Sequence, residues 1–216
     1  MDPFGKQRTR LMYVAQVGDV ARVKWLLARS ARVELKDWEG RTLYWAAWKG
    51  RVATVRELLA RGAAVDAAKI TGTTPLYIAS REGHFEVVRE LLARGAAVDA
   101  AINDGRTPLY GASWTGHLEV VRELLSRGAA VAAARIDGWT PLCIASEEGH
   151  LEIVRELLAR GAAVDAARND GATPLLIASA KGHLEAVREL LARGALPGVV
   201  KNDGSTALSM AIGGGP

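Results

Sequence analysis

The stretch GTTPL at residues 72–76 decides the fold, because the chain repeats its pattern at a fixed interval. Gly-x-Thr-Pro-Leu begins again at Gly105, Gly138 and Gly171, each 33 residues after the one before, and a weaker copy begins at Gly204. A fixed period of this size is typical of a stacked array in which each unit buries its apolar face on its neighbours.

Within each unit, the residue types predict two short helices. Thr74 is a candidate N-cap and Pro75 suits the first helical position, where its missing N–H is not needed. Gly83 is expected to end this first helix in the left-handed conformation, and His84 opens a second helix that ends before Gly95. Helices of two to three turns are too short to persist alone in water, so stacking must stabilise them.

These residues carry a family resemblance. The pattern GxTPLxxAxxxGHxExVxxLLxxGAxV resembles the ankyrin repeat over residues 8–212. The resemblance implies an all-α solenoid of about six helix-turn-helix units with projecting β-turn fingers and a truncated C-terminal half repeat. The expected single domain comprises repeats at 8–39, 40–71, 72–104, 105–137, 138–170 and 171–203 with a partial repeat at 204–212, between tails at 1–7 and 213–216.

Composition limits the other classes of protein. The chain is 49% hydrophobic, enough for a thin continuous core, and its net charge of +4 permits an acidic partner without indicating nucleic-acid binding. The single cysteine, Cys143, excludes an internal disulfide framework. No signal peptide and no apolar run of membrane-spanning length is present, so we expect a cytoplasmic protein with no membrane partner.

No set of residues indicates catalysis, a metal or a cofactor. The histidines recur at the repeat period, so neighbouring copies would lie about 10 Å apart, too far to share a zinc ion. We predict that they serve helix starts and inter-repeat hydrogen bonds; they are His84, His117, His150 and His183. The adjacent carboxylates Glu147 and Glu148 point about 100° apart on a helix, which favours a solvated face over an acid–base pair.

Function is expected where the copies differ. In ankyrin proteins the fingertips, the residue after the turn glycine and the exposed end of the first helix line the concave face that binds partners. Trp, Tyr and Arg dominate interface energies. The predicted partner-binding residues are Trp48, Ile70, Tyr77, Arg81, Asn103, Arg106, Tyr110, Trp114, Ile136, Trp139 and Cys143. Cys143 occupies the slot of Tyr77 and Tyr110 and is expected to be a surface or groove thiol, whereas Trp45 is assigned to packing.

The leading interpretation is a non-enzymatic module that binds another protein. A basic row along the fingers, Lys69, Arg135, Arg168 and Lys201, is compatible with an acidic partner, although aspartates two residues later offset it. Nucleic acid is disfavoured because the row is short. Two alternatives stay open: an orphan scaffold with no partner, and a groove for a nucleotide or other anion in which Arg81 and Arg106 contact phosphate.

Two further expectations concern origin and the C-terminal end. RELLARGAAVDAA is present letter for letter from Arg56, Arg89 and Arg155, which favours an engineered or consensus-derived protein. The half repeat leaves the sixth unit thinly covered around Leu190 and Leu191, so we predict fraying or weak self-association there.

Overall fold

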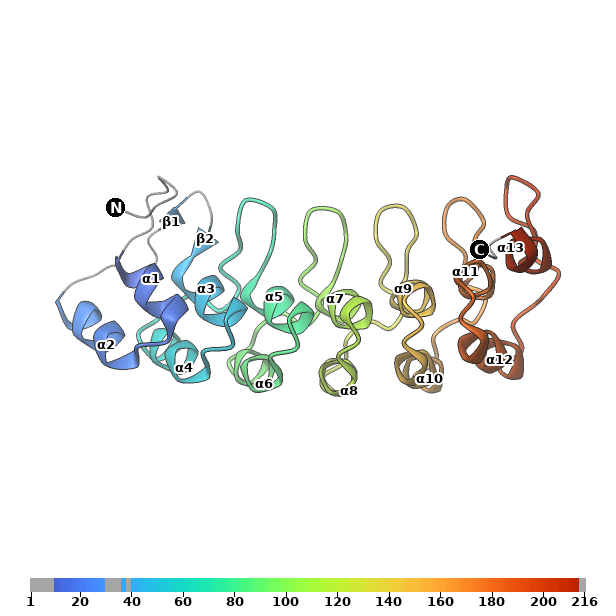
Figure 1. The fold of residues 1–216 in the computed structure, drawn as a ribbon. Coiled ribbons are helices and arrows are strands. Elements are labelled where there is room, and N and C mark those ends of the chain that lie inside the picture. The colour runs from blue at the N-terminus through green and yellow to red at the C-terminus, as the bar shows by residue number, and fades with distance from the viewer. Residues whose placement is uncertain (1–9, 30–35, 38–39, 214–216) are drawn as a thin grey trace. The chain divides into compact units, whose positions relative to one another are not determined.

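The computed structural model describes residues 10–29, 36–37 and 40–213. These residues fall into two compact units, the first up to Asn103 and the second from Asp104 onward. In each unit, short helices follow one another in pairs, and a loop projects from the side of the first helix of a pair (Figure 1). The all-α class with β-turn fingers is therefore confirmed. The predicted tails lie outside the described residues, except Gly213, and the single domain over 8–212 stays a prediction.

The described residues of the first unit form three helix pairs. They are α1 (Arg10–Val17) with α2 (Val20–Ala28), α3 (Thr42–Trp48) with α4 (Val52–Ala60), and α5 (Pro75–Arg81) with α6 (Phe85–Ala93). α3 packs between α1 and α5, and α4 packs between α2 and α6. The first described finger carries a short antiparallel pair, β1 (Lys36–Asp37) and β2 (Gly40–Arg41), with Lys36 opposite Arg41.

The second unit contains three helix pairs and a single last helix. They are α7 (Pro108–Thr115) with α8 (Leu118–Ser126), α9 (Pro141–Glu147) with α10 (Leu151–Ala159), α11 (Pro174–Lys181) with α12 (Leu184–Ala192), and α13 (Ala207–Gly213). α13 packs on α11, whereas α12 packs on α10 and α11 with no further helix beyond it in the described residues. This is the predicted half repeat. The predicted fraying and self-association remain untested.

The expected signals start the first helices of four repeats. The Thr140 hydroxyl accepts a hydrogen bond from the Cys143 amide at 3.1 Å, and Pro141 follows at the first helical position. The same caps begin α5, α7 and α11 at Thr74, Thr107 and Thr173.

The histidines join neighbouring repeats, as predicted. His183 Nε2 lies 2.7 Å from the main-chain oxygen of Glu147 in the preceding repeat, and His84 and His150 make the same bond to Trp48 and Trp114. Gly149 has a φ of 71°, and a Cβ there would lie 2.6 Å from His183 Nδ1. Glycine is therefore required both for the left-handed turn and for the close approach of the imidazole.

Charged side chains form a second link between repeats on the outer helices. Glu189 pairs with Arg193 four residues later at 3.0 Å and with Arg155 of the preceding repeat at 2.9 Å. The same pair within a helix is present between Glu90 and Arg94 at 3.2 Å. The bridge between repeats was not predicted, because it depends on how the helices stack.

The fingers are held by turn residues and by each other. Asp170 accepts a hydrogen bond from the Ala172 amide at 3.2 Å, and Asp104 and Asp203 brace their turns in the same way. Asn169 Nδ2 donates to the Ile136 carbonyl of the preceding finger at 3.2 Å. The fingers therefore form a ladder of hydrogen bonds within the second unit.

Candidate functional site

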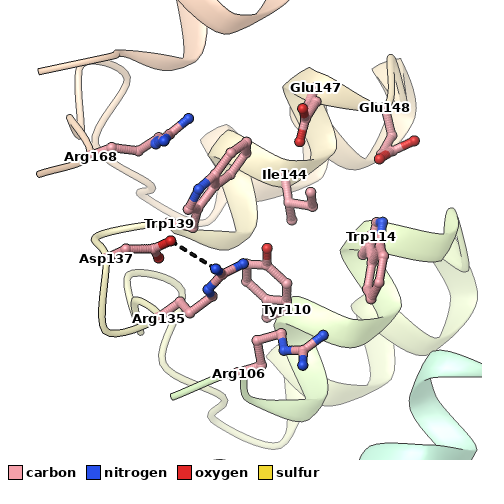
Figure 2. Close-up of a pocket in the computed structure, with 10 residues that line it drawn as sticks. All are labelled: Arg106, Tyr110, Trp114, Arg135, Asp137, Trp139, Ile144, Glu147, Glu148 and Arg168. Atoms are coloured by element: carbon pink, nitrogen blue, oxygen red, sulfur yellow. Dashed lines mark ion pairs between the residues drawn. The ribbon is translucent and has the colours of Figure 1, made fainter. Parts of the chain in front are cut away.

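A pocket of about 460 Å³ opens on the second unit, at the C-terminal ends of α7 and α9 and beside their fingers (Figure 2). Its lining combines aromatic rings, arginines and carboxylates around Ile144. The lining residues are Arg106, Tyr110, Trp114, Arg135, Asp137, Trp139, Ile144, Glu147, Glu148 and Arg168.

The three arginines share one arrangement, since each pairs with the aspartate of its own turn. The N···O distances are 2.8 Å for Arg106 and Asp104, 2.9 Å for Arg135 and Asp137, and 3.4 Å for Arg168 and Asp170. Burial would raise the pKa of Asp104, but the hydrogen bonds and charge of Arg106 outweigh it and hold that pKa below its usual value. The positive charge of each arginine in the pocket is therefore neutralised by an aspartate of the same finger.

The aromatic wall is largely buried. Trp139 is only 9% exposed and packs in a cluster that includes Tyr110 and Ile144. The Arg168 guanidinium carbon lies 4.2 Å from the centre of the Trp139 ring, a close cation–π contact. Burial raises the pKa of Tyr110, and a hydrogen bond from Arg135 opposes that rise, so this hydroxyl stays protonated at neutral pH.

The side of the pocket formed by the helix ends is different in character. Trp114, the penultimate residue of α7, is 36% exposed. Glu147 ends α9 and lies 3.3 Å from Lys181, whereas Glu148 is exposed and makes no ion pair with another residue in the described part of the chain. Figure 2 shows the two carboxylates on the same side of the pocket as Trp114.

Comparison with known families identifies the fold. Residues 1–69, 43–135 and 130–200 each match a model described as ankyrin repeats in three copies. The chain belongs to the ankyrin repeat family. Ankyrin repeat domains generally mediate protein–protein interactions, and the fold typically serves as a non-enzymatic module.

A solved structure gives the same result. The chain is similar to the crystal structure of the human ASB11 ankyrin repeat domain, with a TM-score of 0.86 and 29% sequence identity over 94% of this chain and 92% of that one. A search of curated proteins found no match.

The ankyrin fold brings part of the predicted surface of the second unit together. Arg106, Tyr110, Trp114 and Trp139 line the pocket. Ile136 is 74% exposed on its finger and lies outside the lining.

One prediction about this surface is wrong. Cys143 is fully buried, not a surface or groove thiol, and its Sγ donates to the Ala166 carbonyl at 3.4 Å. Burial raises the pKa of the thiol, which makes it inert. Tyr77 and Tyr110 occupy the equivalent slot and are each 2% exposed. This slot packs between neighbouring first helices, so its side chain varies with the packing rather than with a partner.

In the first unit the predicted residues have different environments. The Trp48 ring is half-buried with its centre 5.2 Å from that of Trp45, which is packed as predicted. Ile70 is 82% exposed. Asn103 donates from Nδ2 to the Ile70 carbonyl at 3.1 Å, so it braces a finger.

Arg81, the remaining predicted residue of this unit, donates from Nε to its neighbour Glu82 at 3.0 Å. This contact engages the guanidinium with a carboxylate of its own helix end. Arg81, one of the two arginines that would contact an anion, is therefore already paired with a carboxylate.

Six lining residues were not predicted as site residues, namely Arg135, Asp137, Ile144, Glu147, Glu148 and Arg168. The repeat spacing could have identified some of them, because equivalent positions in adjacent repeats lie 33 residues apart. Glu147 stands 33 residues after Trp114, and Arg168 stands 33 after Arg135, so each pair occupies one slot in adjacent units.

No described helix combines the length and apolarity needed to cross a membrane. Among the residues that the structure describes, no group of three or more His, Cys, Asp or Glu side chains is placed to hold a metal ion.

Proposed function

We propose that this chain binds a partner protein, without catalysis, through the surface that its first helices and fingers form, which is the concave face in ankyrin proteins. On the second unit, this surface includes the pocket. The observation that carries the proposal is the composition of the pocket: two tryptophans and three arginines line it, at positions where the repeats differ from one another. Such side chains bury large areas with few rotamers, which makes them the dominant contributors to interface energies.

The scaffold supports this role because its binding side chains are already held. The Arg106 and Arg135 guanidinium groups are fixed by turn aspartates, and Trp139 is packed in the core. A preformed surface loses little conformational entropy on docking, so more of the contact energy remains as affinity.

The surface that we propose is smaller than the one expected from sequence. Tyr77 and Cys143 are buried, so they support the surface from beneath rather than contact the partner. Trp114 and Ile136 offer exposed apolar area on the second unit, and on the first unit Ile70 is exposed while Trp48 is half-buried. The identical 13-residue stretches support an engineered or consensus-derived origin, and the single cysteine supports a reducing, cytoplasmic environment.

The experiment is a capture assay with three forms of the full chain as bait. The site variant carries Trp114→Ala and Ile136→Ala. The matched control carries Leu184→Ala and Leu208→Ala, which remove apolar side chains of similar or greater exposure elsewhere on the same unit. Thermal melts establish that all three forms are folded.

The proposal expects at least one protein that binds the wild type and the control and is lost from the site variant, with direct binding confirmed on the purified pair. Proteins retained equally by all three forms would refute it. Capture of no protein by any of the three forms would also refute it and would favour the orphan scaffold.

The anion-binding alternative has weaker support. Arg106 and Arg81 are both engaged with carboxylates, and the Nε atom of Arg168 is enclosed by the protein. A phosphate ligand would have to displace the carboxylates that are already paired with these arginines. A rise in melting temperature with inorganic phosphate, beyond that with matched chloride, would restore this alternative.

A further inference from the structure

We infer that the pocket of the second unit receives a basic side chain, arginine or lysine, from the partner and holds it between the Trp114 ring and the Glu148 carboxylate. This inference rests on the proposed function and adds the chemistry of the residue that is bound. It also differs from the acidic partner that the basic row along the fingers suggested.

The first argument is the balance of charge in the pocket. Each arginine of the lining is compensated by the aspartate of its own turn, at 2.8 to 3.4 Å. Glu147 is compensated by Lys181 at 3.3 Å. Glu148 is left over, because it is exposed and has no ionic partner among the described residues. The uncompensated charge that a ligand meets is therefore negative.

The second argument is the direction of the helices. α7 ends at Thr115 and α9 ends at Glu147, so both present their C-terminal ends to the pocket. The aligned peptide dipoles give a helix C-terminus a partial negative charge, which favours cations and disfavours anions. The Trp114 and Glu147 carbonyls already accept hydrogen bonds from His150 and His183, so this charge resides on the other carbonyls of the last turns. Trp114 and Glu148 each lie within one residue of these ends. A cation between their side chains would therefore also be attracted by the negative ends of the two helix dipoles.

The third argument is the exposed aromatic ring. Trp114 is 36% exposed, and the nearest charged contact to its ring is the Arg106 guanidinium carbon at 5.7 Å, near the limit for a cation–π interaction. The neighbouring Trp139 already holds an arginine at 4.2 Å. A second guanidinium or ammonium group on Trp114 would repeat this contact, whereas a carboxylate would face both the negative ring face and Glu148.

The test uses a small probe on the full chain. The indole N–H signal of Trp114, assigned with Trp114→Phe, is followed by NMR during titration with acetyl-arginine amide. Acetyl-citrulline amide has nearly the same shape without the charge, and acetyl-glutamate amide carries the opposite charge. We expect a saturable shift with the arginine probe, a much smaller one with citrulline and none with glutamate.

Two variants locate the carboxylate. Glu148→Gln should weaken arginine binding about two- to fivefold, as for a partly exposed ion pair. Glu119→Gln, which changes another exposed carboxylate on the outer helix α8, should leave it unchanged.

Each other outcome overturns the inference. A citrulline probe that binds as well as arginine, a glutamate probe that binds better, no shift of Trp114 with arginine, or no effect of Glu148→Gln would each show that the pocket does not select a cation. If the capture assay still gives a partner that depends on the site, the proposed function stands and only this inference fails. If no partner depends on the site, the proposed function itself fails.

Discussion

A single missing carboxylate on the fingers offers a sharp test of how the repeats are joined. Asp66 accepts a hydrogen bond from the Ala97 amide of the next repeat, with both oxygens at 3.2 Å. Asp165 does the same for the Leu196 amide at 3.1 and 3.3 Å. The corresponding slot of the fourth repeat holds Ala132, so the amide that stands opposite, Ala163, has no such acceptor. We predict that Ala132→Asp stabilises the second unit.

The size of the effect follows from the geometry of the existing copies. A net hydrogen bond contributes about 0.5–1.5 kcal/mol, and a charged acceptor strengthens it, but this position is exposed and screened by solvent. We therefore expect about 0.5–1 kcal/mol of added stability from Ala132→Asp. For a chain of this length, that corresponds to a rise in Tm of about 1–4 °C.

The measurement combines thermal unfolding with amide exchange. Asp165→Ala serves as the reciprocal variant and should lower Tm by a similar amount, because it removes an existing acceptor. Exchange of the Ala163 amide should slow in Ala132→Asp, since that amide becomes bonded. The reasoning is refuted if Asp165→Ala destabilises the protein while Ala132→Asp changes neither Tm nor the exchange of Ala163.

Three other predictions follow from burial, charge and the C-terminal end. Trp139→Ala should cost about 3–5 kcal/mol in chemical denaturation, because it removes a ring that is 9% exposed; a loss below 1 kcal/mol would contradict the packing described. The pKa of Asp104 is lowered in the folded state, so its contribution to stability is present above its unfolded pKa of about 4 and is lost as pH falls below that value. Asp104→Asn should accordingly show a shallower loss of Tm between pH 5 and 2 than the wild type, and parallel curves would count against this assignment. Amide exchange should be fastest after Gly194, where Leu208 and Ile212 are 71% and 74% exposed; uniform protection up to Ile212 would disprove fraying.

Much of the local structure could be predicted because it depends on residues close in sequence. Thr140 and Pro141 begin a helix whatever its neighbours are, and Gly149 ends the same helix for steric reasons. The role of the histidines was also predictable, since a period of 33 residues rules out a shared metal site and leaves a bond to the adjacent repeat. Confirmation at His183 required only that the repeats stack.

The site was harder to predict because a position can differ between repeats for two reasons, contact with a partner or packing against neighbouring residues. Cys143 differs from Tyr77 and Tyr110 at the equivalent position, and a difference between copies was interpreted as a surface property. Burial shows instead that the slot adapts to its neighbours: Cys143 packs in one cluster with Trp139 and Ile177. Sequence periodicity identifies the slot but not the direction of its side chain.

The pairing of charged side chains was likewise only partly predictable from the sequence. Arg168 and Asp170 are two residues apart in sequence, and an offset of the basic row by aspartates was expected. The compensation is pairwise, at 3.4 Å, which the sequence does not specify. The unpaired state of Glu148 depends on which cations its neighbours reach, so it could be found only in three dimensions.

The links between repeats have a consequence for how such a chain can change length. Within each unit the histidine bonds described above span 36 residues, as at His150 and His183, and the arginine–glutamate bridges between repeats span 34, as at Arg122 and Arg155. Because these donors find their acceptors at a constant offset, deleting or duplicating one whole period recreates the same junction chemistry at the splice. Long identical stretches such as those at Arg89 and Arg155 are also suitable sites for unequal recombination. The array can therefore gain or lose a whole repeat in a single recombination event. The stacking of the repeats would be kept, and only the order of the variable side chains would change.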